Sequence, residues 1–315
     1  MKLTQKRAAV NKRVLIYGAP KTGKSLIVGK LAEYYNLIWF DNEQGWDVLL
    51  QLPTEWQERI NIISVPDSKL FPIAVETWLK IVKGTKTDIC VQHGKVSCAL
   101  CKKDNKSIDT VQLDITPANT IVVFDSLTQL TASMVSHITK SQPDDYKMQL
   151  DDWGNLKFLM DKFLSQIQAA GYNVVCITHE EMVPMEDGKF KLVPSSGSAK
   201  SSMFTAKYFS DVVYAEVVNK KHRFGSSTDY SMNAIAGSRT GIAMEKAVVP
   251  TLLDIFTSWK DTGFSSGSSS IEDVSVGEVS SNEEGSADLL QSIPAPAPIP
   301  LTPSQIALAN LRNRK

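Results

Sequence analysis

Short apolar runs alternate with amphipathic stretches over the first 260 residues of the chain. Runs of four to seven residues without a polar face are typical of strands buried in a parallel sheet. We expect such strands at 13–17, 36–40, 60–65, 119–125 and 172–178. Apolar residues at helical spacing predict helices at 26–35, 71–82, 127–138 and 144–170, with Gly154 as a candidate break in the last. Alternating strands and helices predict an α/β fold with a mostly parallel central sheet flanked by helices.

The pattern changes after residue 180. Residues 182–193 alternate around a Glu-Asp-Gly sequence and predict a hairpin, and 194–203 are small and polar, as in a flexible loop. We expect two late strands, 211–218 and 229–236, joined by a connection at 219–225, and a short closing helix at 251–259.

A glycine-rich sequence follows the first predicted strand and opens the first helix. It reads Gly-Ala-Pro-Lys-Thr-Gly-Lys-Ser and fits the phosphate-binding pattern G-x-x-x-x-G-K-[ST]. Its glycines let backbone N–H groups approach phosphate oxygens, and the helix start adds a favourable dipole. The strand–loop–helix context argues against a chance match, so we expect ATP or GTP to bind here with Mg²⁺. The predicted nucleotide-binding residues are Gly18, Ala19, Pro20, Lys21, Thr22, Gly23, Lys24, Ser25 and Leu26.

Within this loop, Lys24 is expected to reach the β- and γ-phosphates and Ser25 to offer its hydroxyl to Mg²⁺. Asp125 ends an apolar strand about 100 residues later, the Walker B arrangement, and is the second Mg²⁺ ligand that we expect.

Polar residues also end two other predicted strands. Glu43 follows the second strand and is a candidate general base for an attacking water. A solvated strand-end turn is the alternative reading. His179 ends the strand at 172–178, where it is placed to sense a γ-phosphate, or is simply a polar strand end.

Three of the four cysteines and one of the four histidines cluster between residues 84 and 118. Cys90, His93, Cys98 and Cys101 form a C-x₂-H-x₄-C-x₂-C pattern, which suits a tetrahedral structural Zn²⁺ site with no open position. The segment is too polar for a core of its own, so a metal would stabilise it. A lysine-rich surface loop with incidental cysteines is the alternative.

Three further basic residues are site candidates. Arg223 and Arg239 each follow a late strand, from which either could reach a neighbouring subunit's nucleotide as an arginine finger. Lys200 lies in the loop at 194–203 and is a candidate for DNA phosphate contact.

Charge is balanced overall, with 34 basic and 34 acidic residues, but it is unevenly distributed. Residues 261–301 form an acidic Ser/Pro-rich segment, which predicts a disordered linker, and leave residues 1–260 mildly basic. We expect a flexible basic arm at 1–12, an ATPase domain at 13–260, and a short helix or tail at 302–315 that offers a docking site for a protein partner. No apolar run is long enough to predict a membrane span, and no signal peptide is evident, so we expect a cytoplasmic protein.

Taken together, these motifs resemble the RecA-like P-loop ATPases, AAA-type ATP-binding proteins, of the phage and prophage single-strand-annealing recombination group. The resemblance covers residues 11–255. It implies a RecA-like core, ATP hydrolysis and binding to single-stranded DNA by a homo-oligomer. It assigns Glu43 as the residue that activates water, Asp125 as the Walker B aspartate and His179 as the γ-phosphate sensor.

The resemblance also implies roles for residues after 190. It places a DNA-contacting loop at 194–203 and an interface cation at Arg239, although Gly237 stands where the family's Lys-x-Arg has its lysine. The family core does not require the zinc-like insert. Three alternatives remain open at this point: a hexameric helicase or loader, a nucleotide-switched scaffold or regulator, and a small-molecule kinase.

Overall fold

The computed structural model describes residues 11–104, 107–186, 188–225, 233–239 and 251–257. The chain divides into two units, Met1–Gly263 and Phe264–Lys315, and all described residues belong to the first. Of the flexible arm predicted at 1–12, residues 1–10 lie outside the described residues, as do the linker at 261–301 and the segment at 302–315. Lys12 at the end of the predicted arm is buried, and its backbone N–H donates to Asn173 Oδ1 at 3.0 Å.

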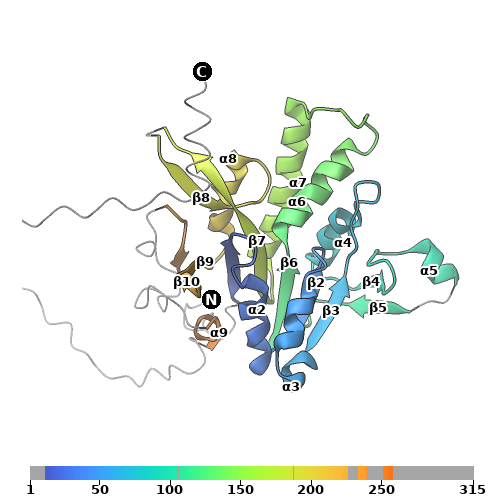
Figure 1. Ribbon diagram of the computed structural model, residues 1–315. Helices are drawn as coiled ribbons and strands as arrows, with labels where there is room; N and C mark the ends of the chain where they lie inside the picture. Colours follow the sequence, from blue (N-terminus) through green and yellow to red (C-terminus); the bar gives the residue numbers. More distant parts are fainter. Residues whose placement is uncertain (1–10, 105–106, 187, 226–232, 240–250, 258–315) are drawn as a thin grey trace, which may run out of the picture. The chain divides into compact units, whose positions relative to one another are not determined.

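The centre of the fold is a mostly parallel sheet with the strand order β10-β9-β1-β7-β6-β2-β3 (Figure 1). Its strands are β1 Arg13–Gly18, β2 Asn36–Asp41, β3 Ile60–Ser64, β6 Thr120–Asp125, β7 Asn173–Pro184, β9 Asp211–Val218 and β10 Lys221–Gly225. The pairs among β9, β1, β7, β6, β2 and β3 are parallel. In the described part of this sheet, antiparallel pairing is confined to β10 and β11 Gly237–Ser238 on β9, and to β8 Phe190–Pro194 on β7. The predicted α/β fold is therefore confirmed.

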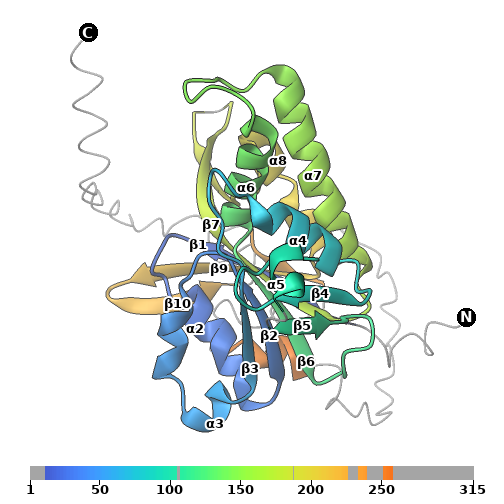
Figure 2. The same cartoon turned by 90° about the vertical axis from the view of Figure 1, so that its right-hand side faces the viewer.

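Helices cover both faces of this sheet (Figures 1 and 2). On one face pack α4 Ile73–Ile81, α6 Leu127–Thr139 and α7 Leu150–Ala169, and on the other α2 Lys24–Gly29, η3 Trp46–Gln51 and α9 Leu253–Thr257. The first face has an aromatic centre, in which the ring of Phe124 lies 5.1 Å from that of Trp78 and 5.3 Å from that of Phe163. Two short elements, η2 Lys30–Glu33 and α3 Thr54–Gln57, complete the second face. No helix in the described part of the chain is long and apolar enough to cross a membrane.

The cysteine-rich segment forms a separate small unit beyond β3 and α4 (Figure 1). Strands β4 Thr87–Cys90 and β5 Ile108–Val111 pair antiparallel, and α5 Ala99–Lys103 lies between them in the chain. The Thr77 hydroxyl of α4 donates a hydrogen bond to the Gly94 carbonyl at 3.0 Å and ties this insert to the main body.

Two predicted helices have different bounds in the structure. The helix expected at 144–170 begins only at Leu150, because Gln149 and Asp152 form a capping box that fixes its first turn, and it continues through Gly154 without a break. The helix expected at 26–35 is shorter, since α2 ends at Gly29 and continues as the 3₁₀ turn η2.

The late strands also differ from the prediction. The expected connection at 219–225 is mostly strand β10, which follows a two-residue turn with positive φ at Asn219 and Lys220. In the part of 229–236 that the structure describes, 233–236, there is no strand, and the next strand is β11. The small polar residues at 194–203 are folded back rather than extended, with α8 Ala199–Ser202 and a buried Ser196 hydroxyl that hydrogen bonds to Thr205.

Candidate functional site

The phosphate loop sits at the carboxyl end of β1, against the backbone of β9. Gly18 has φ 154°, and a Cβ at this position would lie 1.9 Å from the carbonyl oxygen of Ala215, so only glycine fits. The Lys24 ammonium donates hydrogen bonds to the carbonyls of Gly18 at 2.9 Å and Ala19 at 2.8 Å. Burial lowers the pKa of Lys24, while the carboxylates of Glu43 and Asp125 act in the opposite direction.

The two expected magnesium ligands lie side by side. Ser25 Oγ donates to Asp125 Oδ2 at 3.0 Å. Burial, followed by repulsion from the carboxylates of Glu43 and Asp41, raises the pKa of Asp125 to about 7. Asp125 Oδ1 is buried and has no hydrogen-bond partner among the described residues. A hydroxyl and a carboxylate with an unpaired oxygen are hard donors that fit Mg²⁺, so Ser25 and Asp125 would hold it.

Glu43 and His179 meet beside the carboxyl ends of β2 and β6 and the middle of β7. The Nε2 atom of His179 lies 3.2 Å from a Glu43 carboxylate oxygen, and the Ser126 hydroxyl donates to the same carboxylate. Burial tends to raise the pKa of Glu43, but the hydrogen bonds from His179 and Ser126, with the charge of Lys24, outweigh it and lower that pKa. Glu43 is therefore an ionised carboxylate at neutral pH, as a general base must be.

Two neighbours that the sequence did not single out hold the Glu43 segment in place. Asn42 Oδ1 accepts a hydrogen bond from the backbone N–H of Ser126 at 2.8 Å. Asp41 Oδ1 accepts from the N–H groups of Glu43 at 3.0 Å and Gln44 at 2.9 Å. The only sequence signal for them is the run Asp-Asn-Glu directly after a strand.

The remaining basic candidates lie on other elements of the fold. Arg239 follows Ser238, which pairs with Asp211 at the amino end of β9, whereas the phosphate loop is at the carboxyl end of neighbouring β1. Its guanidinium donates to the Lys207 carbonyl at 3.1 Å. Arg223 lies within β10 opposite Glu216, not after a strand. Lys200 lies on α8, beside a cavity of about 480 Å³ that α7 also lines.

The four predicted zinc ligands converge in the insert. The Nδ1 atom of His93 lies 3.6 Å from Cys90 Sγ, 3.7 Å from Cys98 Sγ and 3.3 Å from Cys101 Sγ. All four ligand atoms lie within 4.8 Å of one another. Tetrahedral Zn²⁺ with ordinary Zn–N and Zn–S bond lengths places its ligand atoms about 3.6 Å apart. The donor set and its close spacing therefore fit a structural zinc ion, which these four residues would hold.

Comparison with known proteins decides the family. Residues 10–240 match the family model described as AAA domain, which is more than half of the chain. The chain belongs to this family. This AAA-type domain is thus a P-loop ATPase domain, and the phosphate loop, Asp125, Glu43 and His179 lie inside the matched region.

Other comparisons add little to the AAA assignment. An ATPase from the type III secretion system of pathogenic bacteria is similar to the chain, with 12% sequence identity and a TM-score of 0.36. The match covers 67% of this chain and 53% of the other, so the AAA domain spans about half the length of that ATPase, and no functional argument rests on it. No curated protein matches the sequence.

Proposed function

We propose that this AAA-type domain hydrolyses ATP and acts, as a homo-oligomer, on single-stranded DNA in phage-type recombination, repair or replication. The observation that carries the proposal is that β7 connects the nucleotide site to the β7–β8 hairpin. Residue His179, beside Glu43 and Lys24, lies in the same continuous strand that forms the β7–β8 hairpin.

Hydrolysis follows from the residues at the carboxyl ends of the strands. Lys24 and the loop amides bind the β- and γ-phosphates, and Ser25 and Asp125 would hold Mg²⁺, which would supply positive charge beside them. Glu43 accepts a proton from the water that attacks the γ-phosphorus in line, while the bond from the γ-phosphorus to the β-phosphate oxygen breaks and ADP leaves with that oxygen. His179 orients the Glu43 carboxylate and lies beside Lys24, where it detects loss of the γ-phosphate.

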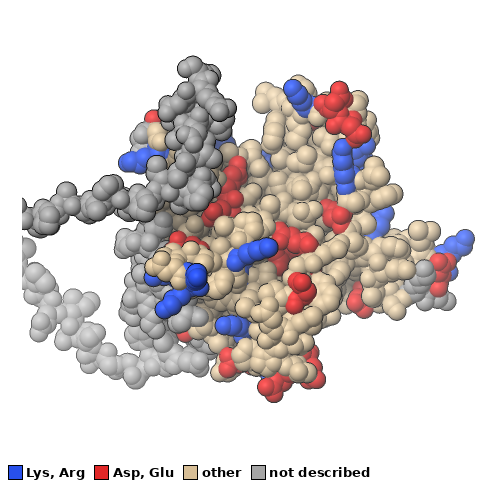
Figure 3. All heavy atoms as spheres, viewed as in Figure 1, with Lys and Arg blue, Asp and Glu red and all other residues tan. Residues whose placement is uncertain are grey.

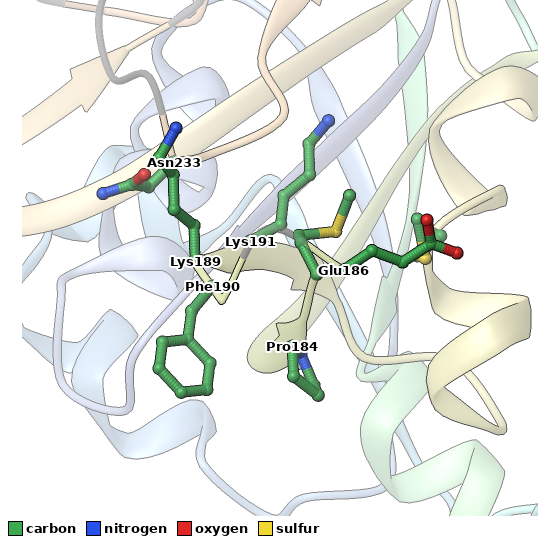
Figure 4. A pocket seen from close by; sticks show the side chains of 8 residues that line it. Pro184, Glu186, Lys189, Phe190, Lys191 and Asn233 are labelled. Atoms are coloured by element: carbon green, nitrogen blue, oxygen red, sulfur yellow. The ribbon is translucent and has the colours of Figure 1, made fainter.

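The hairpin offers what a single strand requires, an exposed aromatic ring with lysines close by. Phe190, the first residue of β8, is 53% exposed, and Lys189 and Lys191 flank it in the chain. These residues line a cavity of about 650 Å³ together with Pro184, Met185, Glu186, Met203 and Asn233. Figure 4 shows Lys189 and Lys191 pointing to one side of the hairpin and Phe190 to the other.

The charge distribution favours a DNA contact at one small part of the surface over a contact along an extended basic groove. On the face shown in Figure 3, basic and acidic side chains are interspersed and do not form a continuous basic stripe. Base stacking is worth about 1–3 kcal/mol per base and needs no such stripe. We therefore place the contact at the hairpin and the neighbouring α8 with Lys200.

The test is ATP hydrolysis by the full chain with and without single-stranded DNA, with Lys24→Ala as the inactive control. We expect DNA to stimulate turnover in the wild type and to have no effect on Lys24→Ala. A rate of ATP hydrolysis that single-stranded DNA does not change would contradict the DNA part of the proposal and favour a nucleotide-switched scaffold. Unwinding of duplex DNA would instead identify a helicase or loader.

A further inference from the structure

The β9–β10 hairpin reaches the phosphate loop from the side opposite to His179. Strand β9 pairs with β1 on one side of the loop, while β7, which carries His179, pairs with β1 on the other. The tight turn at Asn219–Lys220 brings β10 back along β9, with His222 opposite Val217. Phe224, two residues further along and on the same side of the strand, packs against the apolar core around α2.

His222 contacts the phosphate loop directly. Its Nδ1 atom lies 3.0 Å from the carbonyl oxygen of Thr22, and because a carbonyl can only accept, Nδ1 carries the proton and donates it. The ring also packs beside the next residue, since a Cβ at Gly23 would lie 3.1 Å from His222 Nδ1. Gly23 has φ 85°, and it precedes Lys24 at the start of α2.

This hydrogen bond has a consequence for phosphate binding. A trans peptide is planar, so the N–H of Gly23 points opposite to the carbonyl of Thr22. A carbonyl that is held toward His222 therefore keeps the Gly23 N–H directed away from His222. Backbone N–H groups of this loop are the donors that cradle phosphates in the motif.

We propose that His222 is a positioning residue for the nucleotide site, which fixes the Thr22–Gly23 peptide so that the loop binds phosphate. The inference rests on nucleotide binding within the proposed function and is independent of DNA. It assigns the β9–β10 hairpin a role in ATP affinity. The hydrogen bond uses only Nδ1, so a side chain that supplies an N–H at this place can replace the imidazole.

The experiment compares His222→Ala, His222→Asn and His222→Gln in the full chain, without DNA. The amide nitrogen of asparagine reaches the place of Nδ1, whereas that of glutamine extends to the place of Nε2. A fluorescent ATP analogue with Mg²⁺ reports the dissociation constant, and steady-state hydrolysis separates KM from kcat. His137→Ala, an exposed histidine on α6, is the matched control.

We expect His222→Ala and His222→Gln to weaken binding and raise KM about 3- to 10-fold, as for loss of one neutral hydrogen bond, with kcat nearly unchanged. His222→Asn should restore most of the affinity, and His137→Ala should bind like the wild type. If the wild type and His222→Ala bind the nucleotide with equal affinity, the role of His222 is overturned, while the proposed function stands. A loss shared equally by all three His222 variants with a lowered Tm would also overturn this role, because that result indicates a general packing role. A wild type that binds no nucleotide would overturn the proposed function as well.

Discussion

The imidazole of His179 bridges Lys24 and Glu43, with Nδ1 3.4 Å from the Lys24 ammonium and Nε2 3.2 Å from the Glu43 carboxylate. An ammonium group only donates, so Nδ1 accepts and the ring proton lies on Nε2, directed at Glu43. The contact thus links the lysine of the phosphate loop with the candidate base through a single imidazole ring.

We expect Glu43→Gln to lower kcat about 10²- to 10⁴-fold, since general base catalysis contributes about that much. Binding of ATP should persist, because Lys24 and the loop remain. Steady-state turnover and a nucleotide-binding titration measure the two effects. Glu58→Gln, which removes an exposed carboxylate just after α3, is the control and should be fully active. Undiminished turnover in Glu43→Gln would exclude Glu43 as the base.

Phe190→Ala should abolish most of the DNA stimulation while the basal ATPase rate stays unchanged, because the ring lies outside the phosphate site. Loss of one stacking partner should weaken binding to a fluorescent oligothymidine by about 1–3 kcal/mol. The control is Phe158→Ala on α7, which is 66% exposed and lies far from the hairpin in sequence. If both variants bind DNA as tightly as the wild type, the contact lies elsewhere.

Lys12, the residue before β1, makes the free energy of unfolding depend on pH in the alkaline range. Its side chain is buried, and burial lowers its pKa to about 8, while the Asp211 carboxylate acts in the opposite direction. Between pH 8 and 10.5 the unfolded chain then binds more protons at Lys12 than the folded chain, so this residue makes the free energy of unfolding rise with pH.

Denaturant unfolding at several pH values between 7.5 and 10 checks this. The stability of the wild type should rise relative to Lys12→Met as the pH increases through 8. The comparison with Lys12→Met cancels groups that titrate in both proteins. Lys30→Met, at an exposed lysine, should keep the wild-type pH dependence. Parallel curves for wild type and Lys12→Met would show that Lys12 keeps its ordinary pKa in the folded protein.

If the insert binds zinc, loss of one of its four candidate ligands should destabilise the insert and leave the nucleotide site competent. Cys101→Ser should reduce bound zinc from about one per chain and lower Tm, because the ligand set supplies the stability that this polar segment lacks. Elemental analysis and thermal unfolding measure both. Cys176→Ala is the matched control, since Cys176 is equally buried but lies in β7 away from the cluster, and its zinc content should be unchanged. Wild-type protein that takes up no zinc would disprove a metal site.

The sequence predicted the site best where parallel strands end. Ser25, Glu43, Asp125 and His179 are far apart in the chain, yet the parallel pairing of their strands brings them together. Asp125 ends β6, Glu43 follows the end of β2, and Ser25 follows the loop after β1, whereas His179 lies near the middle of β7, where it pairs with Gly18 at the end of β1. The spacing of the cysteines and histidine likewise predicted a cluster that the structure assembles.

Contacts made by edge strands and side-chain caps could not be predicted in this way. The run Lys-His-Arg that precedes Phe224 is polar and short, so nothing in it indicated that His222 would reach Thr22, 200 residues earlier. The position of Arg239 depends on the pairing of β11 with β9, which two residues cannot encode by periodicity. The start of α7 depends on a reciprocal hydrogen bond between Gln149 and Asp152, an uncommon form of the capping box.

Strand β7 is twelve residues long and paired along most of its length, with β1 and β6 in its first half and with β8 in its second. Pairing along its length makes this strand stiff, and His179 lies near its middle. Pro184 lies five residues further, about 17 Å along the axis at the usual rise. A tilt of a few degrees at His179, too small to disturb the hydrogen bonds of the sheet, would move the far end of the strand by about an ångström. A small tilt of β7 at His179 would thus become a larger displacement at the β7–β8 hairpin, because the same strand carries both.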